Sequence, residues 1–170
     1  MSTANPAPAK TPNFPQHTPV ADRDAGPNFS AARVGPLKDL IRYAVDSPRL
    51  GLTLPGKVFL QDVLGLTGME VSLGLMPPHA SIPFLHKHDQ NEEVYLFLRG
   101  RGEMLVDGRV VPVSEGTAVR VAPDGVRCWR NTSDDDLVYL VIQAKAGSLE
   151  QWTGTDGIGV PEPPSWPTPA

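Results

Sequence analysis

Short apolar runs separated by turn residues fill most of the chain between residues 56 and 146. Turn residues such as Pro77-Pro78 and Asp107-Gly108 end these runs, and Asp-Gly suits a two-residue hairpin turn because it accepts positive φ angles. Many short strands at regular spacing predict an all-β fold, either a β-barrel or a double-sheet jelly roll. The strands are predicted at residues 58–64, 69–76, 84–88, 92–98, 103–106, 109–113, 117–122, 127–131 and 137–145.

One short helix is predicted before the strands, at residues 37–45. Apolar residues recur there at helical spacing, at Leu37, Leu40, Ile41 and Ala44. Pro36 suits the first helical position, and Pro48 ends the element.

Both ends of the chain are rich in proline and poor in large apolar residues. Such segments bury too little surface to offset the entropy of ordering, so we expect them to be extended or disordered. Trp166 either docks on a neighbouring subunit or is an isolated exposed residue. The predicted organisation is an arm at 1–28, a helix-containing segment at 29–55, one barrel at 56–146 and a tail at 147–170.

Length and charge narrow the functional classes. The 170 residues suit one domain, and a net charge of -4 argues against a nucleic-acid partner, which requires a basic patch. The sequence has no apolar run long enough for a membrane span, and its N-terminus does not resemble a secretory signal. Cys128 is the single cysteine and has no partner for an internal disulfide, so a reducing, cytoplasmic setting is expected.

The strongest chemical signal is FLHKHDQNEEVYLFLRG, residues 84–100. On a strand, residues two apart share a face, so His86 and His88 point to the same side. Glu93 can join them from the next strand. Two neutral imidazoles and one carboxylate on one side of a metal form a facial triad with open coordination positions.

With these residues the chain resembles the cupin superfamily of small conical β-barrels. The first cupin motif matches at His86, His88, Glu93 and Gly100, whereas Ala80 stands where a glycine is expected. The spacing to Gly100 selects Glu93 rather than Glu92 as the ligand. The resemblance covers residues 56–146.

The second cupin motif is degraded. Gly116 and Asn131 match it, but Ala122 and Asp124 replace its proline and glycine, and Arg127 replaces its histidine. Counting from Gly125 instead places Cys128 at the histidine position and loses the match at Asn131. If Cys128 faced the pocket, its thiolate would favour a softer metal.

The resemblance implies a metal held by three histidines and one glutamate, of which this chain has two histidines and the glutamate. Arginine cannot ligate a cation, because it stays protonated. Two outcomes therefore remain open. Either His86, His88 and Glu93 bind a divalent transition metal (Fe, Mn, Ni, Cu or Zn), or Arg127 occupies the metal position and makes a metal-free anion pocket.

Four residues are predicted to bind substrate: Arg127, Tyr95, Trp129 and Gln143. Arg127 would clamp a carboxylate or phosphate, or else form a structural salt bridge. Tyr95 shares strand parity with Glu93, whereas Trp129 is either a pocket wall or plain core. Gln143 either reaches the metal or substrate, or is an ordinary polar residue at a strand end.

The resemblance implies a homodimer that binds a small molecule. As an enzyme, such a protein would be a metal-dependent dioxygenase or a sugar-type isomerase, and the fold does not choose between them. The alternative is a non-catalytic module that binds or senses an anion through Arg127 without metal. No general base stands apart from the ligand set in the sequence, so catalysis itself is left open.

Overall fold

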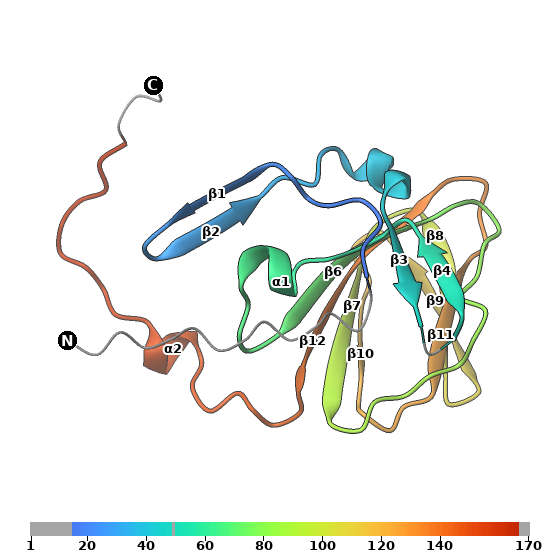
Figure 1. Ribbon diagram of the computed structural model, residues 1–170. Helices are drawn as coiled ribbons and strands as arrows, with labels where there is room; N and C mark the ends of the chain where they lie inside the picture. The colour runs from blue at the N-terminus through green and yellow to red at the C-terminus, as the bar shows by residue number, and fades with distance from the viewer. Residues whose placement is uncertain (1–14, 49, 167–170) are drawn as a thin grey trace.

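Two antiparallel sheets form the body of the protein in this computed structural model, which describes residues 15–48 and 50–166. The larger sheet has the strand order β10-β7-β12-β6-β5 and the smaller one the order β11-β8-β9 (Figure 1). The larger sheet comprises β5 (Lys57–Phe59), β6 (Glu70–Met76), β7 (Asn91–Arg99), β10 (Ala118–Val121) and β12 (Leu137–Lys145). The smaller sheet comprises β8 (Arg101–Val106), β9 (Arg109–Ser114) and β11 (Arg127–Asn131).

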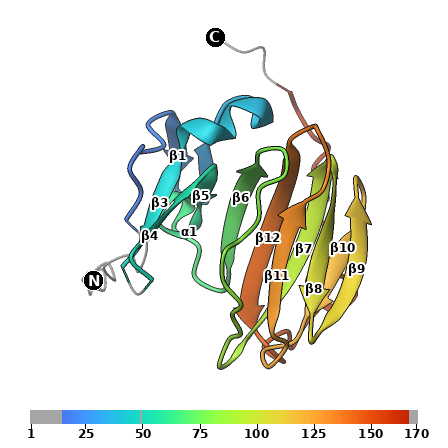
Figure 2. The same ribbon diagram turned by 90° about the vertical axis from the view of Figure 1, so that its right-hand side faces the viewer.

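Figure 2 shows the two sheets stacked face to face, with β11 and β8 in front of β12 and β7. Buried side chains from both sheets fill the space between them, among them Phe97, Met104, Trp129 and Tyr139. Alternating apolar residues on each strand supply this inner face. The predicted all-β jelly-roll class is confirmed. The described strands from β5 onward form two separate sheets rather than one closed barrel, and β1-β2 and β3-β4 are two further two-stranded sheets.

The N-terminal part of the chain covers the opposite face of the larger sheet. Leu75 and Val138 point to that face and pack in a second buried cluster with Val20, Leu40 and Tyr43. This part contains β1 (Arg23–Gly26), β2 (Phe29–Ala32), a 3-10 helix (Leu37–Arg42), β3 (Ala44–Ser47), β4 (Leu52–Pro55) and α1 (Gln61–Leu64).

Two sequence predictions need correction in this N-terminal part. The predicted helix at 37–45 is a 3-10 helix that ends at Arg42, because Val45 is buried in β3 and pairs with Leu54 of β4. The predicted strand at 58–64 ends at Phe59 and is followed by α1, whose C-cap Gly65 takes a φ of 67°. Only glycine adopts that backbone conformation without strain.

The predicted strand at 84–88 is also wrong. Its residues form no continuous ladder, and His86 alone makes an isolated bridge with Arg127. Pro83 directly precedes this segment, and proline has no backbone N–H to contribute to a ladder. The sequence did not predict β1 to β4, nor α2 (Thr153–Asp156) in the tail.

The two predicted end segments lie partly within the described chain. Residues 15–28 of the predicted arm include β1 and the buried Val20, whereas residues 1–14 lie outside the described residues. In the tail, Trp152, Ile158 and Trp166 are exposed. The described residues contain no helix that is long and apolar enough to cross a membrane.

Candidate metal centre

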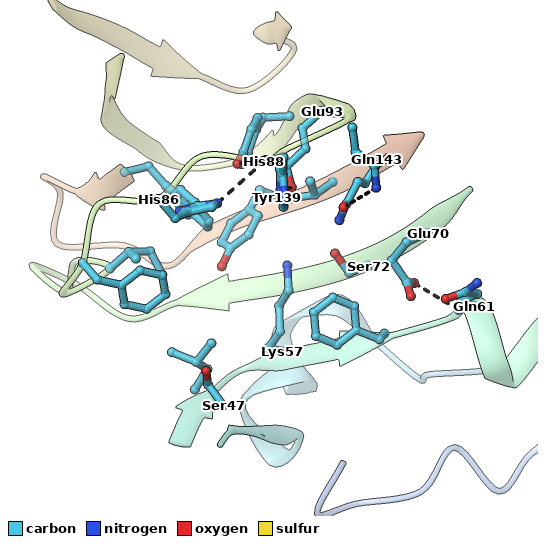
Figure 3. Close-up of a pocket in the computed structure, with 18 of the residues that line it drawn as sticks. Ser47, Lys57, Gln61, Glu70, Ser72, His86, His88, Glu93, Tyr139 and Gln143 are labelled. Carbon is cyan, nitrogen blue, oxygen red and sulfur yellow. Dashed lines mark hydrogen bonds and ion pairs between the residues drawn. The ribbon is translucent and has the colours of Figure 1, made fainter. Parts of the chain in front are cut away.

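His86, His88 and Glu93 converge on the lining of one large cavity. Each offers a ligand atom, and these atoms all lie within 4.8 Å of one another (Figure 3). Backbone hydrogen bonds hold the histidine segment against the smaller sheet: the His86 N–H donates to the Arg127 carbonyl, and the His88 N–H donates to the Pro123 carbonyl. Glu93 extends from β7. The side chains of His86 and His88 therefore still point to the same side, as they would on a continuous strand.

The donor set fits a divalent cation. Nε2 of His88 lies 3.1 Å from Oε1 of Glu93, and Nε2 of His86 lies 3.9 Å from Oε2. Ligands about 2 Å from a transition metal are separated from each other by roughly 3–4 Å. Nδ1 of His86 is buried and makes no hydrogen bond with a described residue. Without a metal, His88 and the Glu93 carboxylate satisfy each other by sharing a proton, and a bound cation would replace that proton because metal ligands must be deprotonated.

The charge states also suit a metal. Burial disfavours the ionised form of Glu93, but hydrogen bonds from His88, Tyr95 and Arg127 outweigh it and lower the pKa to about 2. Burial, reinforced by the charge of Arg127, lowers the pKa of His86 to about 4. At neutral pH, Glu93 is therefore a carboxylate and His86 a neutral imidazole, the forms that bind metals.

Arg127 lies behind Glu93 and is fully buried. Its Nε and Nη2 both donate to Oε2 of Glu93, and its Nη1 donates to the Gly125 carbonyl at 3.0 Å. The Tyr95 hydroxyl donates to the same carboxylate oxygen, so Oε2 has three donors while Oε1 faces His88. This arrangement supports the structural salt bridge for Arg127 rather than the substrate clamp.

Trp129 and Gln143 both line the cavity. The Trp129 ring contacts those of His86, Tyr95 and Tyr139, with the centroids 6.2, 5.0 and 5.4 Å away respectively, so it is both core and pocket wall. The Gln143 side-chain oxygen accepts a hydrogen bond from Asn91 at 2.8 Å. Within the described chain, Cys128 is half-buried and does not belong to the candidate ligand cluster.

The cavity has a volume of about 1860 Å³ and extends beyond the predicted site. His86, His88, Glu93, Tyr95, Trp129 and Gln143 line it, whereas Arg127 does not. Sequence analysis missed a second group of polar residues on the floor of the cavity, namely Lys57, Glu70, Ser72 and Tyr139. Gly74, in the middle of a predicted strand, was the one available signal, because a glycine there marks a close approach.

Comparisons with known proteins agree with this architecture. The family model described as "Cupin domain" matches residues 72–143. A solved cupin protein from Bacteroides fragilis is 46% identical, with a TM-score of 0.60, and the match covers 61% of this chain and 88% of that one. A comparison with curated proteins gives no significant match.

Two further solved structures are more distant. A predicted oxalate decarboxylase from Thermotoga maritima is 28% identical over 44% of this chain and 64% of that chain, with a TM-score of 0.43. A Cupin 2 conserved barrel domain protein from Salinispora arenicola is 22% identical over 47% of this chain and 66% of that chain, with a TM-score of 0.42. Likeness at this level carries no argument about activity.

Proposed function

This chain belongs to the cupin superfamily, and on that basis we propose that His86, His88 and Glu93 bind a divalent transition metal that in turn holds a small organic ligand. One observation carries the proposal. The three side chains each offer a ligand atom, and these atoms all lie within 4.8 Å of one another. Imidazole and carboxylate suit iron, manganese, nickel, copper and zinc, so the donor set does not select one metal.

The other residues of the site position the ligands. Arg127 and Tyr95 fix Oε2 of Glu93 and thereby leave Oε1 directed toward His88. Such contacts behind a ligand set its orientation and its charge. When bound, the metal would supply Lewis-acid or redox chemistry, which is compatible with a dioxygenase or a sugar-type isomerase. Trp129 and Gln143 would contact the ligand from the cavity wall.

Elemental analysis of the purified protein tests the proposal. We expect near-stoichiometric iron, manganese, nickel, copper or zinc in the wild type and its loss in His86→Ala and Glu93→Ala. His79→Ala is the matched control, because His79 is exposed and pairs with Asp134 outside the cluster. No bound metal in the wild type after reconstitution, or equal metal in all four proteins, would refute the proposal.

The alternative, an anion held by Arg127 without metal, has less support. An anion-binding guanidinium needs free donors that face the cavity, whereas Arg127 is fully buried and directs its donors to Glu93 and the Gly125 carbonyl. We assign Arg127 the role of a positioning residue.

We also propose a homodimer in a reducing, cytoplasmic setting. Five large apolar side chains of the tail are at least 66% exposed, and a second copy would cover them: Leu149, Trp152, Ile158, Val160 and Trp166. The compartment rests on the single free Cys128. Sedimentation equilibrium should give twice the chain mass for the wild type and the chain mass for a Trp152→Ser/Trp166→Ser variant. A monomeric wild type would contradict the dimer.

A further inference from the structure

Lys57 is a cation that lines the cavity and forms no ion pair within residues 15–48 and 50–166. It extends from β5, and Figure 3 shows its amino end directed into the space bordered by Tyr139 and Ser72. Its Nζ lies 5.3 Å from the ring centroid of Phe59 and 5.4 Å from that of Tyr139. Among the residues that the structure describes, none forms an ion pair with it. Two aromatic faces stabilise an ammonium but do not neutralise its charge.

The fold makes room for this arrangement. Gly74 lies on β6, which is flanked by β5 and β12, and it pairs with Lys57 on one side and Tyr139 on the other. A Cβ at Gly74 would lie 2.3 Å from Cζ of Tyr139, so a side chain there would displace the ring. Glycine in the middle of a strand weakens it, and its presence here lets the Tyr139 ring lie across β6 toward Lys57.

The same aromatic residues connect Lys57 to the candidate metal centre. The Tyr139 ring contacts Trp129, and Trp129 contacts His86 at a centroid separation of 6.2 Å. Lys57, Trp129 and His86 all line the same cavity. Lys57 and the metal ligands therefore border one continuous space with an aromatic wall.

The anionic groups nearby are already engaged. Glu93 accepts hydrogen bonds from Arg127 and Tyr95, and Glu70 accepts the backbone N–H groups of Leu60 and Gln61. A divalent cation bound by two neutral imidazoles and one carboxylate would add positive charge to the cavity. Lys57 forms no ion pair with a described residue, so its charge is available to attract an anion into this space.

We propose that Lys57 binds the carboxylate of a small organic acid whose apolar body lies against Trp129 and Tyr139 and whose other end reaches the metal centre. The inference rests on the proposed function for that second contact. A single ammonium flanked by the Tyr139 and Ser72 hydroxyls matches the one charge of a carboxylate better than the two of a phosphate monoester. The sequence did not place any substrate-binding residue at this position.

Ligand-observed NMR titrations with benzoate and butyrate test the proposal on the full chain, in zinc-loaded and in chelator-treated protein. The variants are Lys57→Met, Lys57→Arg, which keeps the charge, and Lys145→Met, an exposed lysine at the cavity rim. Benzamide is the uncharged match of benzoate, and phenyl phosphate is its dianionic match. Circular dichroism checks that each variant is folded.

We expect at least one carboxylate to bind the wild type and Lys145→Met at least tenfold more tightly than Lys57→Met, with partial recovery in Lys57→Arg. The proposal is overturned if neither carboxylate binds the wild type, if Lys57→Met binds equally well, or if benzamide or phenyl phosphate binds as tightly as benzoate. Metal content is measured in the same samples. Lys57-dependent binding in a protein that holds none of iron, manganese, nickel, copper and zinc would refute the metal site and leave the carboxylate site standing.

Discussion

Arg127 and Lys57 are two cations near the candidate metal centre, and they differ in whether they form an ion pair. Arg127, on β11, is fully buried, and its donors engage Glu93 and a backbone carbonyl. Lys57, on β5, lies between two aromatic rings and forms no ion pair with any described residue. The contrast shows why a cation in a pocket is not by itself a ligand contact. A paired cation holds the site together, whereas an unpaired one is available for a ligand.

The largest loss of stability should come from removing Arg127, the paired cation. Arg127→Met leaves the buried Glu93 without its cationic partner, and removing one member of a buried ion pair typically costs about 3–5 kcal/mol. Urea denaturation of the metal-free protein measures this loss. Arg130→Met is the matched control on the same strand, because Arg130 pairs with Glu103 and is 60% exposed. The control should lose about 0.2–1 kcal/mol. Equal losses in the two variants would show that the Arg127 pair is not special.

The second prediction disturbs the surroundings of the unpaired Lys57 by replacing Gly74. A methyl group at that position overlaps the Tyr139 ring, and overpacking of this kind costs about 1–3 kcal/mol. Gly68→Ala should be nearly neutral, because nothing lies within 4 Å of a Cβ there. The cost of Gly74→Ala should fall when Tyr139 is first replaced by leucine, which a double-mutant cycle of unfolding free energies would detect. An unchanged cost in that background would contradict the close approach.

Removing the unpaired cation Lys57 should have a smaller effect of opposite sign, an increase in stability. Burial lowers the pKa of Lys57 to about 8, against partial compensation by Glu93 and Glu70. The charged form is therefore destabilising in the folded state. Lys57→Met should raise the unfolding free energy by about 1–2 kcal/mol at pH 7, less than the roughly 3 kcal/mol of the full pKa shift because Lys57 is only partly buried.

The pH dependence of this gain identifies its cause. Between pH 8 and 10.5 the unfolded chain keeps the Lys57 proton while the folded chain has released it, so the wild type gains stability as the pH rises. The advantage of Lys57→Met should therefore shrink across this window. Denaturation at pH 7 and pH 10 checks it, and a constant difference would attribute the gain to packing instead.

The smallest effect distinguishes two adjacent carboxylates. Glu92 pairs with the exposed Arg120, so Glu92→Gln should change the unfolding free energy by only about 0.2–1 kcal/mol. Its metal content should equal that of the wild type, unlike that of Glu93→Gln. Elemental analysis of both variants is the check, and metal loss in Glu92→Gln would show that the motif had been read one residue out of register.

The sequence predicted the parts of this protein whose signal is local. Apolar runs between turn residues located β7 and β12 closely, and the spacing of His86, His88 and Glu93 brought the candidate ligands together. The strands β1 and β2 were missed, because RDAG and FSAA contain no run of large apolar residues.

Lys57 was missed for a different reason. It reaches Tyr139 only because β5 and β12 flank β6, a pairing that no local pattern encodes. Motif spacing predicted Arg127 beside the candidate ligands, but its hydrogen bond to Glu93 depends on the packing of two sheets. Contacts between residues on different strands are therefore seen only in the structure, because no local sequence pattern encodes them.

The central claim is that His86, His88 and Glu93 hold a metal while Arg127 stays behind the carboxylate. Anomalous diffraction from crystals grown with manganese or zinc tests it most directly. The account predicts one strong anomalous peak within bonding distance of all three side chains, with the Arg127 guanidinium still on Glu93. Absence of a peak at these residues, with the metal bound elsewhere or not at all, would contradict it.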